Sequence, residues 1–287
     1  MAHSSFDDLL GAAEHMGSLA GAALAREAED SGTAEEDVRA RMLVTLAVMR
    51  DAVATGITGT ARSRSGLTGG DAARVAASGA GPVGGVFAST LAAALATGEV
   101  NAAMGRIVAA PTGGASGVLP AVVLTVGTER AASDDELVDA LLAAAGIGAV
   151  IAARATLSGA VGGCQAEVGS AAAMAAGAAV QLCGGSPAQA GHAAALALQG
   201  LMGLVCDPVG GLVEVPCVYR NGTGAAVALA AAEMALAGVG FPIPLDQVID
   251  AQAQVGRSLP PSLRETALGG LAATPAGREL GERARRG

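Results

Sequence analysis

The chain has 287 residues, enough for one large domain or two, with 17 basic and 26 acidic residues and a formal net charge of −9. This acidic balance argues against nucleic acid as a partner, because binding to phosphates needs a basic face. All 17 basic residues are arginines. Enzymes that use pyridoxal phosphate hold it as a Schiff base with lysine, so this chain alone cannot carry out that chemistry.

The composition predicts the fold class. Hydrophobic residues make up 52% of the chain, but aromatic residues only 1%, and there are 43 glycines. A core of Ala, Leu and Val with Gly surfaces lets helices approach closely. Strand signals are nearly absent, and Val122–Val123 is the strongest. We therefore expect a single all-α domain with buried Ala/Gly-rich central helices. Within it, we expect N-terminal helices in 1–55, functional motifs in 56–272 and a variable tail in 273–287.

Capping signals locate the expected helices along the chain. Ser5 precedes a helix that reaches about His15, and a second helix is expected at 19–29. Two capping boxes, Thr33–Glu36 and Ser133–Glu136, open helices that run to about 54 and 153. Further helices are expected from Asp71 and at 82–97, 167–182, 187–204, 224–237 and 246–255.

Two Gly-rich segments are expected to form loops that could bind a small anionic ligand. The segment 56–70 combines glycines and hydroxyl groups with two arginines, which could contact a small anionic ligand or simply lie in solvent. The segment 110–117 exposes backbone N–H groups of the kind that bind a carboxylate. Turns between buried helices are also Gly-rich, so this second signal is weak by itself.

Residues 168–206 contain no Asp, Glu or Arg, and this stretch is long enough to cross a membrane. However, Gly184–Pro187 interrupts it, and several Gln residues add polarity. We expect two helices buried inside a soluble protein and no membrane contact. The first residues are acidic rather than basic and apolar, so we expect a cytoplasmic protein. In that reducing compartment, cysteines are more often metal ligands or catalytic groups.

Three of the four cysteines, Cys164, Cys206 and Cys217, each lie beside Gly or Pro, where we expect loops. Cys164 opens an Ala-rich helical run, and a helix N-terminus favours a thiolate. With 41 and 10 residues between them, they do not form the close pairs of a zinc finger. Together they could hold an iron–sulfur cluster with one iron lacking a cysteine. Otherwise they are buried free thiols, as we expect for Cys183.

Five segments around these cysteines resemble the α chain of iron–sulfur-dependent L-serine dehydratase (L-serine ammonia-lyase). The resemblance runs from about Ala34 to Ala272, and its motifs are highly specific. The segments are SRSGLTGGDA (63–72), EVNAAMGRIVAAPTGG (99–114), GGCQAEVGSAAAMAAG (162–177), LVCDPVGGLVEVPCVYRN (204–221) and RETALGGLA (264–272).

The resemblance implies an all-helical lyase that converts L-serine to pyruvate and ammonia without pyridoxal phosphate, in amino-acid catabolism and gluconeogenesis. It also implies a 4Fe-4S cluster whose ligands match Cys164, Cys206 and Cys217. An iron without a cysteine can act as a Lewis acid on a hydroxyl group that leaves poorly. L-threonine or L-cysteine as substrate, or a redox sensor without turnover, are the alternatives.

The family works as two parts, and the second carries a Ser-rich, His-containing segment that reaches the active site. These 287 residues contain no such segment, so we expect a β subunit and a hetero-oligomer. The candidates for the base that removes the Cα proton are Glu167, Asp207 and His192. Alternatively, Glu167 and Asp207 only cap helices, and His192 is a structural histidine of the core. Arg154 is a further candidate cation for the substrate carboxylate. The candidate substrate-binding residues are Thr68, Asn101, Arg106, Thr112, Ser158, Arg220 and Asn221.

Overall fold

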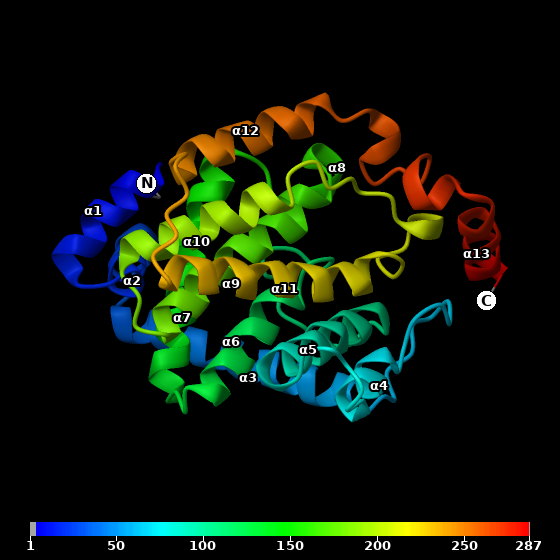
Figure 1. The fold of residues 1–287 in the computed structure, drawn as a ribbon, viewed down its shortest axis with the longest axis horizontal. Coiled ribbons are helices and arrows are strands. Elements are labelled where there is room, and N and C mark those ends of the chain that lie inside the picture. Colours follow the sequence, from blue (N-terminus) through cyan, green and yellow to red (C-terminus); the bar gives the residue numbers. More distant parts are fainter. Residues whose placement is uncertain (1–3, 287) are drawn as a thin grey trace.

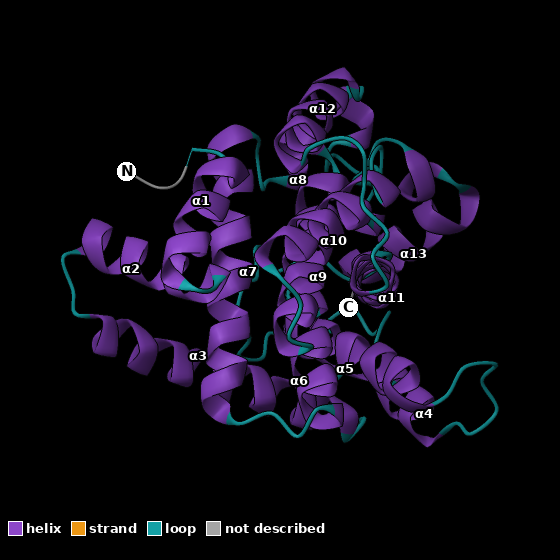
Figure 2. Ribbon diagram, turned by 60° about the vertical axis from the view of Figure 1, so that its left-hand side comes forward, coloured by secondary structure: helices purple, strands orange, loops and turns teal. Residues whose placement is uncertain are grey.

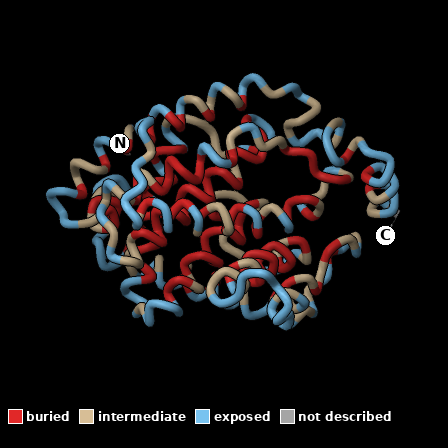
Figure 3. The backbone as a smooth tube through the Cα atoms, in the orientation of Figure 1, coloured by how far each residue is buried: buried red, intermediate tan, exposed pale blue. Residues whose placement is uncertain are grey.

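Three helices rich in Ala and Gly occupy the centre of the computed structural model, which describes residues 4–286. They are α9 (Ser170–Leu182), α10 (Pro187–Gly200) and α11 (Cys217–Leu236). Every residue of α9 from Ser170 to Val180 is buried, and α9 packs against α10, α11 and two further helices. Figure 3 shows the buried residues concentrated in these central helices, with exposed residues around them.

Ten further α-helices surround this centre (Figures 1 and 2). On the N-terminal side are α1 (Phe6–Met16), α2 (Leu19–Ser31), α3 (Glu35–Ile57), α6 (Val118–Glu129) and α7 (Asp134–Arg154). The others are α4 (Asp71–Ala77), α5 (Gly85–Ala102), α8 (Gly159–Gly162), α12 (Leu245–Ser258) and α13 (Pro275–Arg286). Short turns of π- or 3₁₀-helix are η1 (Gln165–Gly169), η2 (Val209–Gly211), η3 (Pro261–Leu263) and η4 (Gly270–Ala273).

The prediction of a single all-α domain is confirmed. Residues 4–286 contain no β-strand, only one isolated bridge between Cys206 and Arg264. The apolar stretch 168–206 forms two buried helices, as expected, with a break before Ser186, whose side chain caps α10. The strongest strand signal, Val122–Val123, lies in α6, a helix that the sequence did not predict. Both valines are completely buried there, and burial outweighs their β propensity.

One helix of the described chain, α7, is long and apolar enough to cross a membrane by length and composition. However, 67% of its apolar window is buried against other helices of the fold. Its outer neighbours α2 and α3 and its inner neighbour α9 cover it, so its apolar character is that of a core helix.

Replacing Ser133 by Ala should lower the free energy of unfolding by about 1 kcal/mol. Ser133 caps α7 through a complete capping box with Glu136, as predicted. The capping box predicted at Thr33 is wrong: α3 begins after Ala34, and no side chain caps it. Thr33→Ala is therefore the matched control, expected to change stability by only a few tenths of that amount. Urea denaturation of both variants measures the difference, and equal losses would contradict it.

Helices α3 and α5 meet at Gly56, where a Cβ would overlap the backbone of Ala96. Gly56→Ala should therefore destabilise the protein by about 2 kcal/mol or more, because backbone cannot move aside as a side chain can. At Gly11 in α1, no other part of the described chain 4–286 comes within 4 Å of the Cβ position, apart from the backbone of the helix itself and the neighbouring residues. Gly11→Ala should stabilise the fold by roughly 0.5–1 kcal/mol through helix propensity. Thermal unfolding measures the change in stability of both variants. A change of the same sign in Gly56→Ala and Gly11→Ala would refute this packing argument.

Candidate active site

Three segments from different parts of the fold bring Cys164, Cys206 and Cys217 to one small cavity. Cys164 directly precedes η1, Cys206 lies in the connection after α10, and Cys217 is the first residue of α11. All three are buried free thiols, and all three line a space of about 20 Å³. Glu167 and Glu265 line the same space. The sequence placed Cys217 in a loop before a helix at 224, but the helix begins seven residues earlier, at Cys217 itself.

The donor atoms in this space suit a metal centre. The sulfurs of Cys164 and Cys206 and a carboxylate oxygen of Glu167 all lie within 4.8 Å of one another. Cysteine thiolates are the usual ligands of iron–sulfur clusters, and three thiols leave one iron of a four-iron cluster without a cysteine. The residues therefore fit such a cluster through the chemistry of their donors. Between the thiols there is now space for little more than one water molecule, so binding a cluster would require these side chains to turn outward.

Arg220, on the first turn of α11, adds positive charge beside the thiols. Its Nη1 donates a hydrogen bond to the sulfur of Cys164 at 3.4 Å and to the carbonyl of Val205 at 2.9 Å. The hydrogen bond from Cys206, and then the charge of Arg220, lower the pKa of Cys164 despite its burial. The same hydrogen bond and burial raise the pKa of Cys206, and burial raises that of Cys217 to about 12. The guanidinium of Arg220 therefore favours the thiolate form of Cys164.

Asp207 holds the guanidinium of Arg220 in place through an ion pair. Its Oδ1 lies 2.8 Å from Nη2 of Arg220, and its Oδ2 accepts a hydrogen bond from the backbone N–H of Leu271 at 2.6 Å. Asp207 is 2% exposed and is not among the residues that line the cavity. This predicted base therefore joins the arginine to the C-terminal segment and does not face a substrate.

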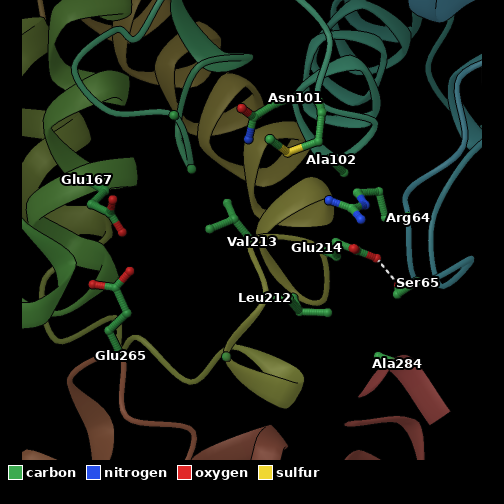
Figure 4. Close-up of a pocket in the computed structure, with 14 residues that line it drawn as sticks. Arg64, Ser65, Asn101, Ala102, Glu167, Leu212, Val213, Glu214, Glu265 and Ala284 are labelled. Carbon is green, nitrogen blue, oxygen red and sulfur yellow. Dashed lines mark hydrogen bonds between the residues drawn. The ribbon is translucent and has the colours of Figure 1, made fainter. Parts of the chain in front are cut away.

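A second cavity of about 700 Å³ adjoins the thiols (Figure 4). It shares Gly114, Glu167, Val213 and Glu265 with the small cavity, so the two form one continuous site. Its walls come from distant parts of the chain: residues 64–65, 101–102, 104, 113–114 and 211–214, with Glu167, Glu265 and Ala284.

Glu167 lies where the two cavities meet. Its Oε1 accepts a hydrogen bond from the hydroxyl of Thr112 at 2.7 Å, and its Oε2 lies 4.0 Å from the sulfur of Cys206. Burial raises the pKa of Glu167, although the bond from Thr112 opposes the shift. Of the three predicted bases, only Glu167 lines the site. His192, on α10, lines neither cavity and instead accepts a hydrogen bond from the backbone N–H of Phe241.

The predicted substrate-binding residues are partly brought together. Asn101 lines the large cavity, and Thr112 reaches the site through Glu167. Asn221 is buried and its side chain is committed to protein: Oδ1 accepts from the N–H of Gly117, and Nδ2 donates to the carbonyls of Gly114 and Cys217. It therefore ties the Gly-rich segment 110–117 to α11, and so holds one wall of the site.

The other candidates lie outside both cavities. Arg106 and Ser158 are exposed, and Thr68 is buried within the loop before α4. Arg154 forms ion pairs with Asp250 and Asp246 on α12. None of these four side chains lines either cavity, although Ser158 directly precedes Gly159, which lies against Glu167 and Cys206.

Glu214 and Glu265 line the site but were not predicted, whereas Arg64 and Ser65 belong to the segment 56–70 that was expected to contact a small anion. The hydroxyl of Ser65 donates to Oε2 of Glu214, which is 5% exposed. Glu265 has a left-handed backbone (φ 63°), and its N–H donates to the carbonyl of Cys206 at 2.8 Å. All four lie within the segments 63–72, 204–221 and 264–272, whose motifs already pointed to the site.

The predicted variable tail also has a place at the site. In it, α13 packs against η2, and Ala284 forms part of the cavity wall. Gly210 of η2 and Gly281 of α13 face each other so closely that a Cβ on either would lie 3.1 Å from the other's Cα. Small residues at this contact bring α13 to the edge of the cavity.

Converging thiols beside an open, acidic cavity define this fold as a helical protein with a candidate metal centre. The family model described as "Serine dehydratase alpha chain" matches residues 14–272, so the chain belongs to the serine dehydratase alpha chain family. It is 48% identical over 260 residues to the "Probable L-serine dehydratase, alpha chain" of Bacillus subtilis, covering 90% of this chain and 86% of that one.

Two other relatives extend the comparison. The "L-serine dehydratase, alpha chain" of Peptoniphilus asaccharolyticus is 43% identical over 261 residues, which cover 90% of this chain and 89% of the relative. The "L-serine dehydratase" of Streptomyces coelicolor is 41% identical over 272 residues, but the match covers only 60% of that longer protein.

Proposed function

We propose that this chain is the α subunit of an L-serine dehydratase, which converts L-serine to pyruvate and ammonia. One observation carries the proposal: three cysteines from separate segments line a cavity that opens into a space large enough for an amino acid. The membership of the serine dehydratase alpha chain family supports the same conclusion.

The cofactor that we propose is a 4Fe-4S cluster held by Cys164, Cys206 and Cys217. When bound, such a cluster supplies a Lewis acid that helps the β-hydroxyl of the substrate to leave. Arg220 supports the ligands from behind, because its guanidinium already donates to Cys164 and is fixed by Asp207. The chain has no lysine for a pyridoxal phosphate Schiff base, which is consistent with a route that needs no such cofactor.

We assign the proton transfer to Glu167. The hydroxyl of Thr112 fixes its Oε1, which leaves Oε2 on the side of the thiols to take the proton from Cα. A correctly placed base typically contributes about 10²–10⁴-fold to the rate. After water has been lost, the resulting aminoacrylate tautomerises and hydrolyses to pyruvate and ammonia without further help from the protein.

We propose a β subunit as partner and the reducing cytoplasm as location, where pyruvate would enter catabolism or gluconeogenesis. The Bacillus and Peptoniphilus relatives are both named as alpha chains, which supports a further subunit. Near the open cavity, the exposed apolar side chains Met104 (76%) and Leu268 (74%) provide surface that a partner could cover.

The test is anaerobic reconstitution of the chain with iron and sulfide in the presence of the candidate β subunit. We expect cluster absorbance and pyruvate from L-serine, both lost on chelation and restored by iron and sulfide. Added pyridoxal phosphate should change nothing. Parallel assays with L-threonine and L-cysteine define the substrate, since one methyl group is worth only about 1–3 kcal/mol of discrimination. A reconstituted cluster without turnover of any of the three would refute the enzyme assignment and favour a sensor.

A further inference from the structure

The charges around the large cavity are unbalanced. Among the residues described, the charged side chains that line it are three carboxylates, Glu167, Glu214 and Glu265, and one cation, Arg64. Figure 4 shows Arg64 on the opposite side of the cavity from Glu167 and Glu265, with its guanidinium directed into the space. An α-amino acid carries an ammonium and a carboxylate. The lining offers several groups for the ammonium but only Arg64 for the carboxylate.

Arg64 is also uncommitted, unlike the arginines that the sequence suggested. Arg220 is engaged by Cys164 and Asp207, and Arg154 by two aspartates of α12. Arg62, two residues before Arg64, donates to the carbonyls of Gly59 and Ala61 in its own loop. Within residues 4–286, no hydrogen bond or ion pair holds the guanidinium of Arg64.

The backbone of Arg64 is nevertheless held in place by the turn that carries it. The N–H of Ser63 donates to the carbonyl of Thr68 at 3.0 Å, and the N–H of Thr68 donates to the hydroxyl of Ser63 at 3.1 Å. Ser65 anchors the turn to the buried Glu214. A fixed backbone with a free guanidinium suits ligand binding, because less ordering is required when the ligand arrives.

We infer that Arg64 binds the α-carboxylate of the substrate amino acid and so makes a free carboxylate a requirement for binding. This inference rests on the proposed function, since it takes an amino acid as the ligand. The planar guanidinium can donate two parallel hydrogen bonds to a carboxylate, which is stronger and more selective than a point charge. The same loop was predicted to contact a small anion, and the structure assigns that contact to the second of its two arginines.

The test compares Arg64→Met, Arg64→Lys and the matched control Arg62→Met in the reconstituted holoenzyme with its β subunit. Arg64→Met should raise the KM for L-serine by about 10- to 100-fold with kcat changed much less, because the contact is made in ground and transition states alike. Arg64→Lys should recover part of the loss, and Arg62→Met should match the wild type. Iron content and thermal midpoint confirm that the variants are folded and loaded.

Two inhibitors test whether Arg64 recognises the carboxylate of the substrate rather than its other groups. Glycine keeps the ammonium and carboxylate of serine, whereas ethanolamine keeps the ammonium and hydroxyl but lacks the carboxylate. In Arg64→Met the inhibition constant for glycine should rise by the same factor as KM, and that for ethanolamine should stay unchanged. A KM within about twofold of wild type, an equal shift in Arg62→Met, or an equal loss of ethanolamine binding would each overturn the inference.

Calorimetric titration of glycine into the same proteins separates this inference from the proposed function. If the wild type forms no pyruvate, the proposed function fails, and the titration still decides the role of Arg64. Weaker glycine binding in Arg64→Met than in Arg62→Met supports a carboxylate site. Equal binding, or no binding to the wild type, overturns it.

Discussion

Replacing Cys164, Cys206 or Cys217 by Ser is expected to abolish pyruvate formation from L-serine, with a loss well beyond about 100-fold in kcat. Each thiol is one of three that line the small cavity, and a serine hydroxyl is a poor ligand for iron in a cluster. The fold should persist, because serine is close to cysteine in size. Iron and sulfide content after anaerobic reconstitution should fall together with activity.

Cys183→Ser is the matched control for these three variants. Cys183 follows the last residue of α9, is only half buried and packs against the core away from the site. Its replacement should leave iron content and turnover close to wild type. If Cys183→Ser lost the cluster, or if one of the other three kept both cluster and activity, the proposed ligand set would be wrong.

Glu167→Gln is expected to lower kcat by roughly 10²–10⁴-fold while iron content stays at the wild-type level. The amide keeps the size of the carboxylate, and its oxygen can still accept the hydrogen bond from Thr112. What it loses is the ability to take a proton at the position of Oε2. Single-turnover measurements with L-serine deuterated at Cα would show whether proton removal is the slowed step.

Glu265→Gln provides the comparison, because Glu265 is the other carboxylate that lines both cavities. We expect a smaller loss, since no side chain within the described residues holds the carboxylate of Glu265 as Thr112 holds that of Glu167. A loss as large as that of Glu167→Gln would transfer the role of base to Glu265. A Glu167→Gln protein without iron would instead make Glu167 a ligand, as its nearness to Cys164 and Cys206 allows.

The sequence predicted the parts of the molecule that depend on local signals. The caps at Ser5 and Ser133 and the break at Gly184–Pro187 appear as expected, because each depends on a few neighbouring residues. The cap at Thr33 failed because Ala34 took the N-cap position, and Thr33 instead accepts a hydrogen bond from Arg41. The spacing of a capping motif does not by itself determine which residue takes the N-cap position.

The site was predicted less completely than the helices, because the sequence does not show in which direction a side chain points. The positions of Cys164, Cys206 and Cys217 beside Gly or Pro and the family resemblance indicated that these cysteines belong together, and the structure brings them to one cavity. These signals did not indicate where the side chains beside them point. Starting a helix at Cys217 turns Arg220 towards Cys164, whereas Asp207, adjacent to Cys206 in sequence, points away from the cavity. The cavity walls also join segments more than 200 residues apart, such as 64–65 and Glu265, which no local pattern links.

The packing of α13 has a practical consequence for work on this enzyme. Because Gly210 and Gly281 are in close backbone contact, a methyl group added at either would require η2 and α13 to shift apart by a few tenths of an ångström, beside the cavity wall at Ala284. Alpha chains with identical thiols could therefore admit substrates of different size through substitutions in η2 and α13 alone. An affinity tag for purification is better attached at the amino end, before α1, than directly after α13, which forms part of the cavity wall.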